Sequence, residues 1–349
     1  NIEISGVSLT IDGSLSAGEK LCLSRYNGKE SKLINNGGVV TAGELIIKNG
    51  SQIEITDEKS IINCKNLKYE SDNLSCLDKG TLNITGNMDI NSKFITTDLC
   101  NIIMSGEDTQ EIRTKEATNL GMVKSLNDSV HGVKISSKIK ITDLQNGKHR
   151  VGYIYDGETI TNDTAIDGDV YVSGYLEINA CSLLVYGNLY QDREIICNDA
   201  SIEIKENLYQ GYNIRVENTK IEVKGNYVVN AIYNNISKTN EVDNSKIDIR
   251  GNLILESCWH SYIDVNLDGS ILHRENDKYA KYIEAYIYAI LTFNGEKVNN
   301  DKNTIAEVDT IIVNSTEITL EDEVCVRKEI DLKDAKLKGQ PLIKVQGLG

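Results

Sequence analysis

The sequence is nearly free of residues that kink a chain or supply large aromatic surfaces: its 349 residues include one Pro, one Trp and two Phe. Basic residues are also in deficit, because 37 Lys and Arg stand against 52 Asp and Glu and give a formal net charge of −15. Such a charge repels phosphate groups, so we expect neither nucleic acid nor an anionic membrane as a partner. No window approaches the roughly 18 uninterrupted apolar residues of a membrane span, and we expect no membrane insertion.

Metal-binding and redox motifs are missing as well. The eight cysteines are scattered without a CxxC pair, and none of the four histidines stands in an HxxxH or HExxH arrangement. Zinc-ribbon and thioredoxin-like folds therefore have no support, and we expect no metal and no cofactor. Disulfides stay open as an alternative.

What is abundant favours strands and tight turns. The chain contains 45 Ile and 36 Asn, and Ile, Val, Thr and Tyr combined with Asn, Asp and Gly are typical of β-strands separated by turns. We therefore expect an all-β protein. The sequence begins at Asn1 in the middle of this pattern, without a basic segment followed by an apolar one, which indicates a mature or excised piece of a longer protein.

An internal repeat carries most of the information about the fold. Four similar segments recur every 19 residues, and a fifth follows after 26: 169–171, 188–190, 207–209, 226–228 and 252–254. Apolar residues superpose in columns two residues apart, for example Leu183 with Ile202 and Val185 with Ile204, as in strands with one buried face. The pattern predicts a right-handed parallel β-solenoid with rungs of about 19 residues. A β-sandwich is the alternative.

A longer repeat predicts two tandem units. The segment 103–107 returns as 292–296, and the tail at 133–141 corresponds to the one at 318–326. We expect a first β-helical unit with its closing segment at 1–150 and a second at 151–349.

The rung motifs resemble a known class of repeats. The phrase from Val185 to Gln191, the rungs that end in Gly-Asn, and the Ser-Gly-x-x-x-Gln element from Ser105 to Gln110 resemble the β-helical repeat regions of large secreted or cell-surface proteins of clostridia and related Firmicutes. The resemblance covers residues 40 to 335, although Val298 and Asn299 stand where the second Gln is expected. It implies an extracellular or cell-surface location and a role in adhesion, with no common catalytic set.

Two groups of residues are candidates for ligand binding. Tyr171, Tyr190 and Tyr209 share one column, and alternation places them on the outer face. A row of aromatic rings suits a polysaccharide, but it also suits a cross-strand stack that only stabilises the sheet. Trp259 and His260 follow the lengthened rung, and we expect them in a loop that contacts a ligand.

Residues 277–289 break the strand pattern. Tyr279, Tyr282 and Tyr286 recur at helical spacing with other apolar residues, which predicts a short helix that passes into a strand at about Ala289. The helix would cover an edge of the solenoid, or its tyrosines would form an interaction face.

The columns of charge favour a surface role over catalysis. Glu203, Glu222 and Asp248 lie beside Lys205, Lys224 and Arg250, as expected for solvated ion pairs. We therefore expect a non-enzymatic extracellular β-helix with an adhesive or spacer role, whose partner is a polysaccharide or another surface protein. The alternative is a carbohydrate-active enzyme, a polysaccharide lyase or glycoside hydrolase, on the same scaffold. The sequence does not specify an oligomeric state.

Overall fold

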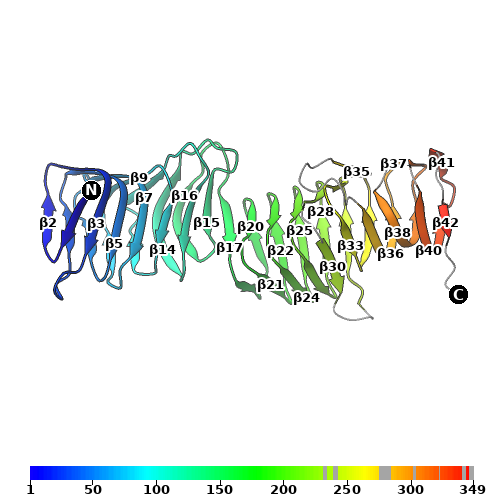
Figure 1. Cartoon of the computed structure of the whole chain (residues 1–349), viewed down its shortest axis with the longest axis horizontal. Helices are drawn as coiled ribbons and strands as arrows, with labels where there is room; N and C mark the ends of the chain where they lie inside the picture. Colours follow the sequence, from blue (N-terminus) through cyan, green and yellow to red (C-terminus); the bar gives the residue numbers. More distant parts are fainter. Residues whose placement is uncertain are drawn as a thin grey trace. The chain divides into compact units, whose positions relative to one another are not determined.

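The computed structural model describes residues 1–230, 234–238, 243–274, 284–301, 304–321, 323–339 and 343–345, and every regular element among them is a β-strand (Figure 1). Strands of successive turns pair in parallel, and the chain forms a right-handed parallel β-solenoid of about 16 turns. The predicted fold class is confirmed, whereas a β-sandwich would need antiparallel neighbours. Within these ranges no helix is long and apolar enough to cross a membrane.

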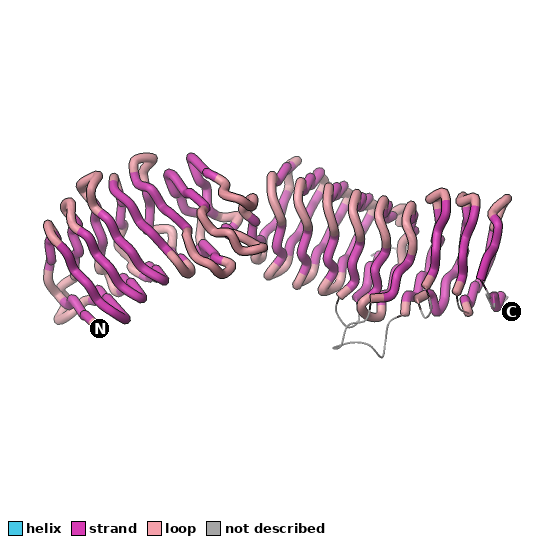
Figure 2. The backbone as a smooth tube through the Cα atoms, turned by 90° about the horizontal axis from the view of Figure 1, so that it is seen from above, coloured by secondary structure: helices cyan, strands magenta, loops and turns pink. Residues whose placement is uncertain are grey.

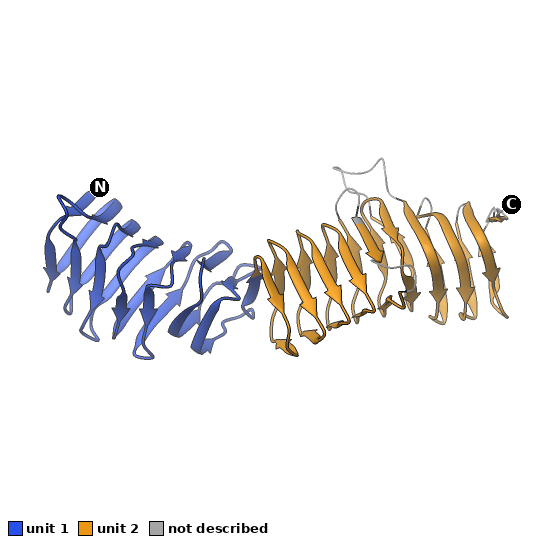
Figure 3. Cartoon of the chain, turned by 90° about the horizontal axis from the view of Figure 1, so that it is seen from below, with its two compact units in different colours: residues 1–154 blue, residues 155–349 orange. Residues whose placement is uncertain are grey.

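The chain divides into two compact units, Asn1–Ile154 and Tyr155–Gly349 (Figure 3). The boundary lies slightly beyond the predicted one at residue 150. In each unit, strands alternate with short turns (Figure 2). Repetition of one rung, rather than a mixture of layers, therefore builds both units.

The first unit contains strands that stack by parallel pairing into one large and one five-stranded sheet. Their bounds are β1 Ile2–Ser5, β2 Ser8–Ile11, β3 Ser14–Ser24, β4 Lys32–Asn35, β5 Val39–Lys48, β6 Gln52–Ile55, β7 Ile61–Glu70, β8 Ser75–Leu77, β9 Gly80–Ile84, β10 Met88–Ile90, β11 Phe94–Thr96, β12 Cys100–Met104, β13 Gln110–Thr114, β14 Thr118–Ser125, β15 Val133–Ser136, β16 Ile139–Gln145 and β17 Gly152–Tyr155.

Rungs of the first unit are longer and less regular than predicted. Leu21 pairs with Ile2 on the rung before it and with Leu45 on the rung after it, and the second interval along the chain is the longer one. Leu45 then pairs with Leu67, an interval of intermediate length. The expected period therefore describes only the first of these intervals.

The second unit contains shorter strands in its first rungs and longer strands toward its end. Their bounds are β18 Glu158–Ile160, β19 Thr164–Ile166, β20 Val170–Val172, β21 Leu176–Asn179, β22 Ser182–Val185, β23 Leu189–Gln191, β24 Ile195–Asn198, β25 Ser201–Ile204, β26 Leu208–Gln210, β27 Ile214–Glu217, β28 Lys220–Val223, β29 Tyr227–Val229, β30 Asn234–Lys238, β31 Lys246–Ile249, β32 Leu253–Leu255, β33 Trp259–Ser261, β34 Asp264–Leu267, β35 Ile271–His273, β36 Ala285–Phe293, β37 Lys297–Asn300, β38 Ile305–Val313, β39 Glu317–Leu320, β40 Val324–Asp331, β41 Lys336–Gly339 and β42 Ile343–Val345.

The regular register predicted for the second unit is confirmed. Val170 pairs with Leu189, Leu189 with Leu208, and Leu208 with Tyr227. The predicted interior column of Val185, Ile204 and Val223 is fully buried. Stacked apolar side chains therefore form the core of each rung, and no rung buries its apolar face alone.

The recurring Gly-Asn phrase forms an asparagine ladder at one corner of the second unit. The side-chain Oδ1 of Asn188 accepts a hydrogen bond from the backbone N–H of Asn207 at 3.1 Å, and Asn207 in turn accepts from Asn226 at 2.8 Å. The preceding Gly187 allows the coils to approach, since a Cβ there would lie 2.4 Å from the Asp169 carboxylate. The motif thus satisfies turn amides that strand pairing leaves free.

The long repeat corresponds to equivalent strands in the two units: β12 with β36, β15 with β39, and β16 with β40. In the first copy, Gln110 is buried, accepts from the Gly106 N–H at 2.7 Å, and donates to the Gly86 carbonyl at 2.6 Å. In the second copy Val298 is buried near Gly295 instead. An apolar contact therefore replaces the glutamine-capped turn.

The predicted helix over 277–289 is wrong where it can be compared. Residues 285–289 belong to strand β36, which starts earlier than the expected Ala289, whereas Tyr279 and Tyr282 lie outside the described residues. Ala285 and Ile287 are buried, and Tyr286 between them faces outward. Pairing with β33 imposes this alternation and overrides the helical spacing of the sequence.

Candidate functional site

The predicted tyrosine column exists and is tightly stacked. Tyr171 on β20, Tyr190 on β23 and Tyr209 on β26 are register partners. Their ring centroids lie 4.8 and 4.7 Å apart, with interplanar angles of 4° and 7°. Tyr171 is only 8% exposed, and the other two rings are half-buried. We call these three residues the tyrosine ladder.

This stacking limits what the ladder offers to a ligand. Tyr190 has a ring on each side, so neither of its faces is free for a sugar. Burial raises the pKa of Tyr171 and Tyr190, which keeps both hydroxyl groups protonated at neutral pH. The geometry is that of a cross-strand stack, and a binding role for the ladder stays a prediction.

Trp259 lies in strand β33 and is fully buried, so the prediction of a loop is wrong. Its indole Nε1–H donates to the Gln210 side-chain oxygen at 3.1 Å, and the Tyr227 hydroxyl donates to the same oxygen. The Trp259 and Tyr227 rings meet edge to face, 5.6 Å apart. Because this packing leaves no exposed indole surface, Trp259 supports the core and does not present itself to a ligand.

His260, the next residue, faces outward and begins a second aromatic group. It pairs with Tyr286 of β36, and the two rings stack 4.9 Å apart. Tyr262 and Tyr288 lie beside them, with centroids 5.0 Å apart and planes inclined by 32°. Tyr262 is 37% exposed. We call His260, Tyr262, Tyr286 and Tyr288 the aromatic quartet.

Sequence reasoning found half of this quartet. His260 and Tyr286 were candidates in two separate predicted sites, and the structure brings them together. Tyr262 and Tyr288 were missed, although each stands two residues after a candidate, the spacing that places side chains on one face of an extended chain. The missing signal was the pairing itself, since His260 and Tyr286 are distant in the sequence and become neighbours only when β33 pairs with β36.

A thiol contacts the quartet without forming an activated nucleophile. The Cys258 Sγ lies 3.5 Å from His260 Nε2. Burial raises the pKa of the Cys258 thiol and lowers the pKa of the His260 imidazole. Both shifts favour the neutral pair over the thiolate and imidazolium that cysteine nucleophiles use.

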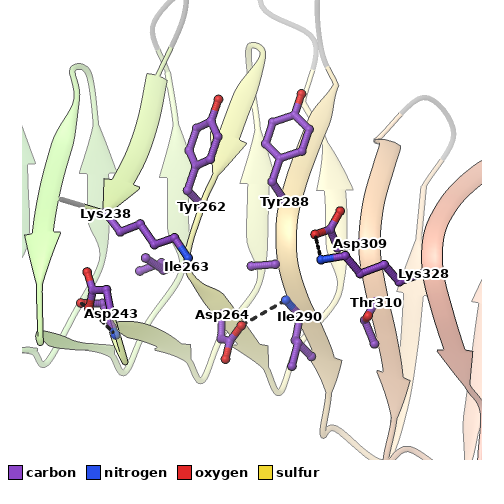
Figure 4. A pocket seen from close by; sticks show the side chains of 12 residues that line it. Lys238, Asp243, Tyr262, Ile263, Asp264, Tyr288, Ile290, Asp309, Thr310 and Lys328 are labelled. Atoms are coloured by element: carbon purple, nitrogen blue, oxygen red, sulfur yellow. Dashed lines mark hydrogen bonds and ion pairs between the residues drawn. The ribbon is translucent and has the colours of Figure 1, made fainter. Parts of the chain in front are cut away.

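Next to the quartet lies a pocket of about 230 Å³. Tyr262 and Tyr288 form one wall and point to the same side, above charged groups from neighbouring rungs (Figure 4). Lys328 contacts the Asp309 carboxylate at 2.6 Å, and Asp264 accepts the Ile290 N–H at 3.1 Å. We call this cavity the Asp309 pocket.

The charge columns form ion pairs on the surface of the second unit, as predicted. Glu222 contacts Lys224, and Arg250 lies 3.2 Å from the same carboxylate. Hydrogen bonds from Lys224 and Arg250 lower the pKa of Glu222 to about 2. Glu203 and Glu222 are thus paired with cations at the surface, as solvated ion pairs are. The third carboxylate of the predicted column differs, because Asp248 is only 7% exposed and pairs with Lys220 at 3.2 Å.

Among the residues that the structure describes, no three His, Cys, Asp or Glu side chains gather in a way that could hold a metal ion. All eight cysteines are free thiols, so none of them is in a disulfide. Comparison with protein-family models, with curated proteins and with solved structures finds no match. The candidate site therefore rests on its own geometry: the aromatic quartet and the Asp309 pocket.

Proposed function

We propose that this chain is a non-enzymatic β-solenoid of an extracellular or bacterial cell-surface protein, with an adhesive role exercised by binding polysaccharide at the aromatic quartet. The location and the adhesive role follow from the resemblance of the rung motifs to surface-protein repeats. The observation that carries the binding role is the quartet itself, four outward aromatic side chains beside a polar pocket.

The quartet differs from a packing cluster in ways that suit a sugar. Tyr286 and Tyr288 are only partly buried, and Tyr262 is an exposed residue. Aromatic faces contact the C–H groups of a pyranose ring, while hydroxyl and charged groups nearby accept or donate hydrogen bonds. The Asp309 pocket supplies such groups within the same surface.

The solenoid suits adhesion because it holds the site on a rigid support. Each quartet strand also carries buried residues, Trp259 in β33 and Ile287 in β36. Outward side chains on such strands are positioned before a ligand arrives, which lowers the entropy cost of binding. Repetition of the rungs also makes the chain a spacer.

A binding experiment with two double variants tests the proposal. The chain is first incubated with insoluble cellulose, chitin, xylan and peptidoglycan, and a reducing-sugar assay runs in parallel. Tyr286→Ala combined with Tyr288→Ala should then lower affinity for the retained polysaccharide about tenfold or more, as expected when two aromatic contacts of roughly 1 kcal/mol each are lost.

The matched control is Tyr190→Ala combined with Tyr209→Ala, which removes two rings from the tyrosine ladder and should leave affinity unchanged. Equal retention of the quartet variant and the unmodified chain would contradict the assignment of the site. Release of reducing ends would instead favour the alternative of a carbohydrate-active enzyme. Retention on none of the polymers would leave a spacer role alone.

A further inference from the structure

The Asp309 pocket contains buried acceptors that the described residues do not satisfy. Asp309 is 7% exposed, and its Oδ1 has no hydrogen-bond partner there, although the Arg327 Nε lies 3.7 Å away. At the other end of the pocket, Asp243 leaves its Oδ2 without a partner among the same residues, while its Oδ1 accepts the Ser245 N–H at 2.8 Å (Figure 4). A buried carboxylate oxygen without a donor carries a free-energy cost, which a donating ligand removes.

The pocket also favours positive charge over negative charge. Its lining includes three aspartates, Asp243, Asp264 and Asp309, against the two lysines Lys238 and Lys328. Arg327 beside the lining does not reverse this balance, because it lies 3.3 Å from Glu307 as well as 3.7 Å from Asp309. The Tyr288 ring, which forms a wall, already has the Arg327 guanidinium 5.7 Å from its centroid. An aromatic face that attracts a guanidinium attracts an ammonium group for the same electrostatic reason.

We propose that the Asp309 pocket receives the ammonium group of an amino sugar, so that the polysaccharide bound at the aromatic quartet is one that carries free amines. This inference rests on the proposed function and adds the chemical class of the ligand. The net charge of −15 acts in the same direction, because it attracts a cationic polymer and repels uronic-acid polymers at long range.

Three oligosaccharides that differ only at C2 test the inference. The β-1,4-linked hexamers of glucosamine, N-acetylglucosamine and glucose carry an amine, an amide and a hydroxyl at this position. Calorimetric titration of the full chain should give the glucosamine hexamer an affinity about tenfold higher than either neutral hexamer, as for one charge-assisted hydrogen bond.

The pH dependence provides a test that needs no variant. The advantage of the glucosamine hexamer should vanish as the pH rises above the pKa of its amines. The charged and titratable groups of the pocket are Lys238, Asp243, Asp264, Asp309 and Lys328, and those beside it and the quartet are Arg327, Glu307, Glu284 and His260. Titration of His260 changes the affinity for all three hexamers. The ratio of the affinity for the glucosamine hexamer to that for a neutral hexamer therefore reports the charge of the amine alone.

Asp309→Asn should remove most of the glucosamine advantage while leaving the neutral hexamers unchanged, and thermal melting shows whether the variant is folded. The matched control, Asp192→Asn, removes one exposed carboxylate elsewhere in the second unit and should preserve the advantage. An advantage that persists equally in both variants would overturn the role of the pocket.

The two proposals fail in different ways. Suppose that the unmodified chain binds all three hexamers equally and that the double variant Tyr286→Ala, Tyr288→Ala binds none of them. This result would overturn the amine preference and leave polysaccharide binding intact. An affinity for the glucosamine hexamer that the quartet variant does not reduce would overturn both. Absence of binding to every hexamer and every insoluble polymer would likewise remove the proposed function and the inference together.

Discussion

In the tyrosine ladder neighbouring rings lie within 7° of parallel, whereas in the aromatic quartet the inclination reaches 39° between His260 and Tyr288. The ladder rings cover each other, and one of them, Tyr171, is buried. In the quartet the His260 and Tyr286 rings stack at 16°, whereas the Tyr288 ring is inclined by 25–39° to the other three, and Tyr262 stays exposed. Outward aromatic residues on a solenoid thus become either packing or an accessible surface, and the presence of an aromatic residue at an outward position does not distinguish the two.

The two groups of aromatic residues differ in how regular the rungs around them are. The ladder lies on rungs of equal length, where identical positions superpose. The quartet joins β33 to β36, and the next pairing, of β36 with β38, contains two shifts of register. On β38 the register partner of Tyr286 is Glu307 rather than an aromatic residue, so the stack of His260 and Tyr286 is not continued on that rung. We therefore expect binding surfaces where the repeat is disturbed and structural stacks where it is regular.

The largest loss of stability is expected from a substitution in the core of the regular rungs. Ile204→Asp places a carboxylate between Val185 and Val223 in a fully buried column. Burial of such a group without partners should cost about 4 kcal/mol or more, a large part of a typical stability of about 5–15 kcal/mol. Far-UV circular dichroism should show that cooperative melting is lost. Ser201→Asp, an exposed position on the same strand, is the control, and wild-type melting of Ile204→Asp would mean that the column is not interior.

A smaller effect should come from the residue that links the two regions. Gln210→Leu leaves the Trp259 Nε1–H and the Tyr227 hydroxyl without their shared acceptor, at a cost of about 2–4 kcal/mol if each donor contributes roughly 1–2. Trp259 is the single tryptophan, so its fluorescence reports the change directly. We also expect weaker binding at the quartet, because His260 adjoins Trp259 in β33.

Gln191→Leu is the matched control for this prediction. Gln191 is buried at the same position one rung earlier, but its side-chain oxygen has no hydrogen-bond partner in the described part of the chain. Gln191→Leu should therefore destabilise the protein less than Gln210→Leu does, and it should leave the fluorescence emission of Trp259 unchanged. Equal effects of the two substitutions would show that Gln210 does not hold the two aromatic rings.

The smallest effect concerns the charged column of the same rungs. Hydrogen bonds from Lys224 and Arg250 lower the pKa of Glu222 to about 2 from its ordinary value of 4.5. A lowered pKa stabilises the folded state above pH 4.5, and this contribution is lost as the pH falls toward 2. Glu222→Gln should flatten the acid limb of the stability curve while changing the free energy of unfolding at pH 7 by about 1 kcal/mol or less. High salt should weaken the effect in the unmodified chain, and an unchanged acid limb in the variant would contradict it.

Sequence periodicity predicted the solenoid well because each regular rung repeats the same pattern of buried and exposed positions. Val185, Ile204 and Val223 are equivalent by spacing alone, and their burial follows from strand alternation. Periodicity failed where pairing crossed an insertion. Nothing near Tyr286 indicates that His260 is its neighbour, and helical spacing was a misleading local signal there. Likewise, Trp259 looked like a loop residue until β33 placed it against Tyr227.

The asparagine ladder makes the regular rungs interchangeable. The side-chain oxygen of each asparagine accepts a hydrogen bond from the next rung, and its backbone N–H donates one to the previous rung. A copied rung inserted after Asn207 would therefore find the same donor on one side and the same acceptor on the other. Stability in such a stack depends on nearest neighbours. Adding or removing a rung would therefore change the length of this part of the second unit in steps of about 4.8 Å, one strand spacing, without altering the aromatic quartet. The length of the regular stack could then change independently of the proposed binding site.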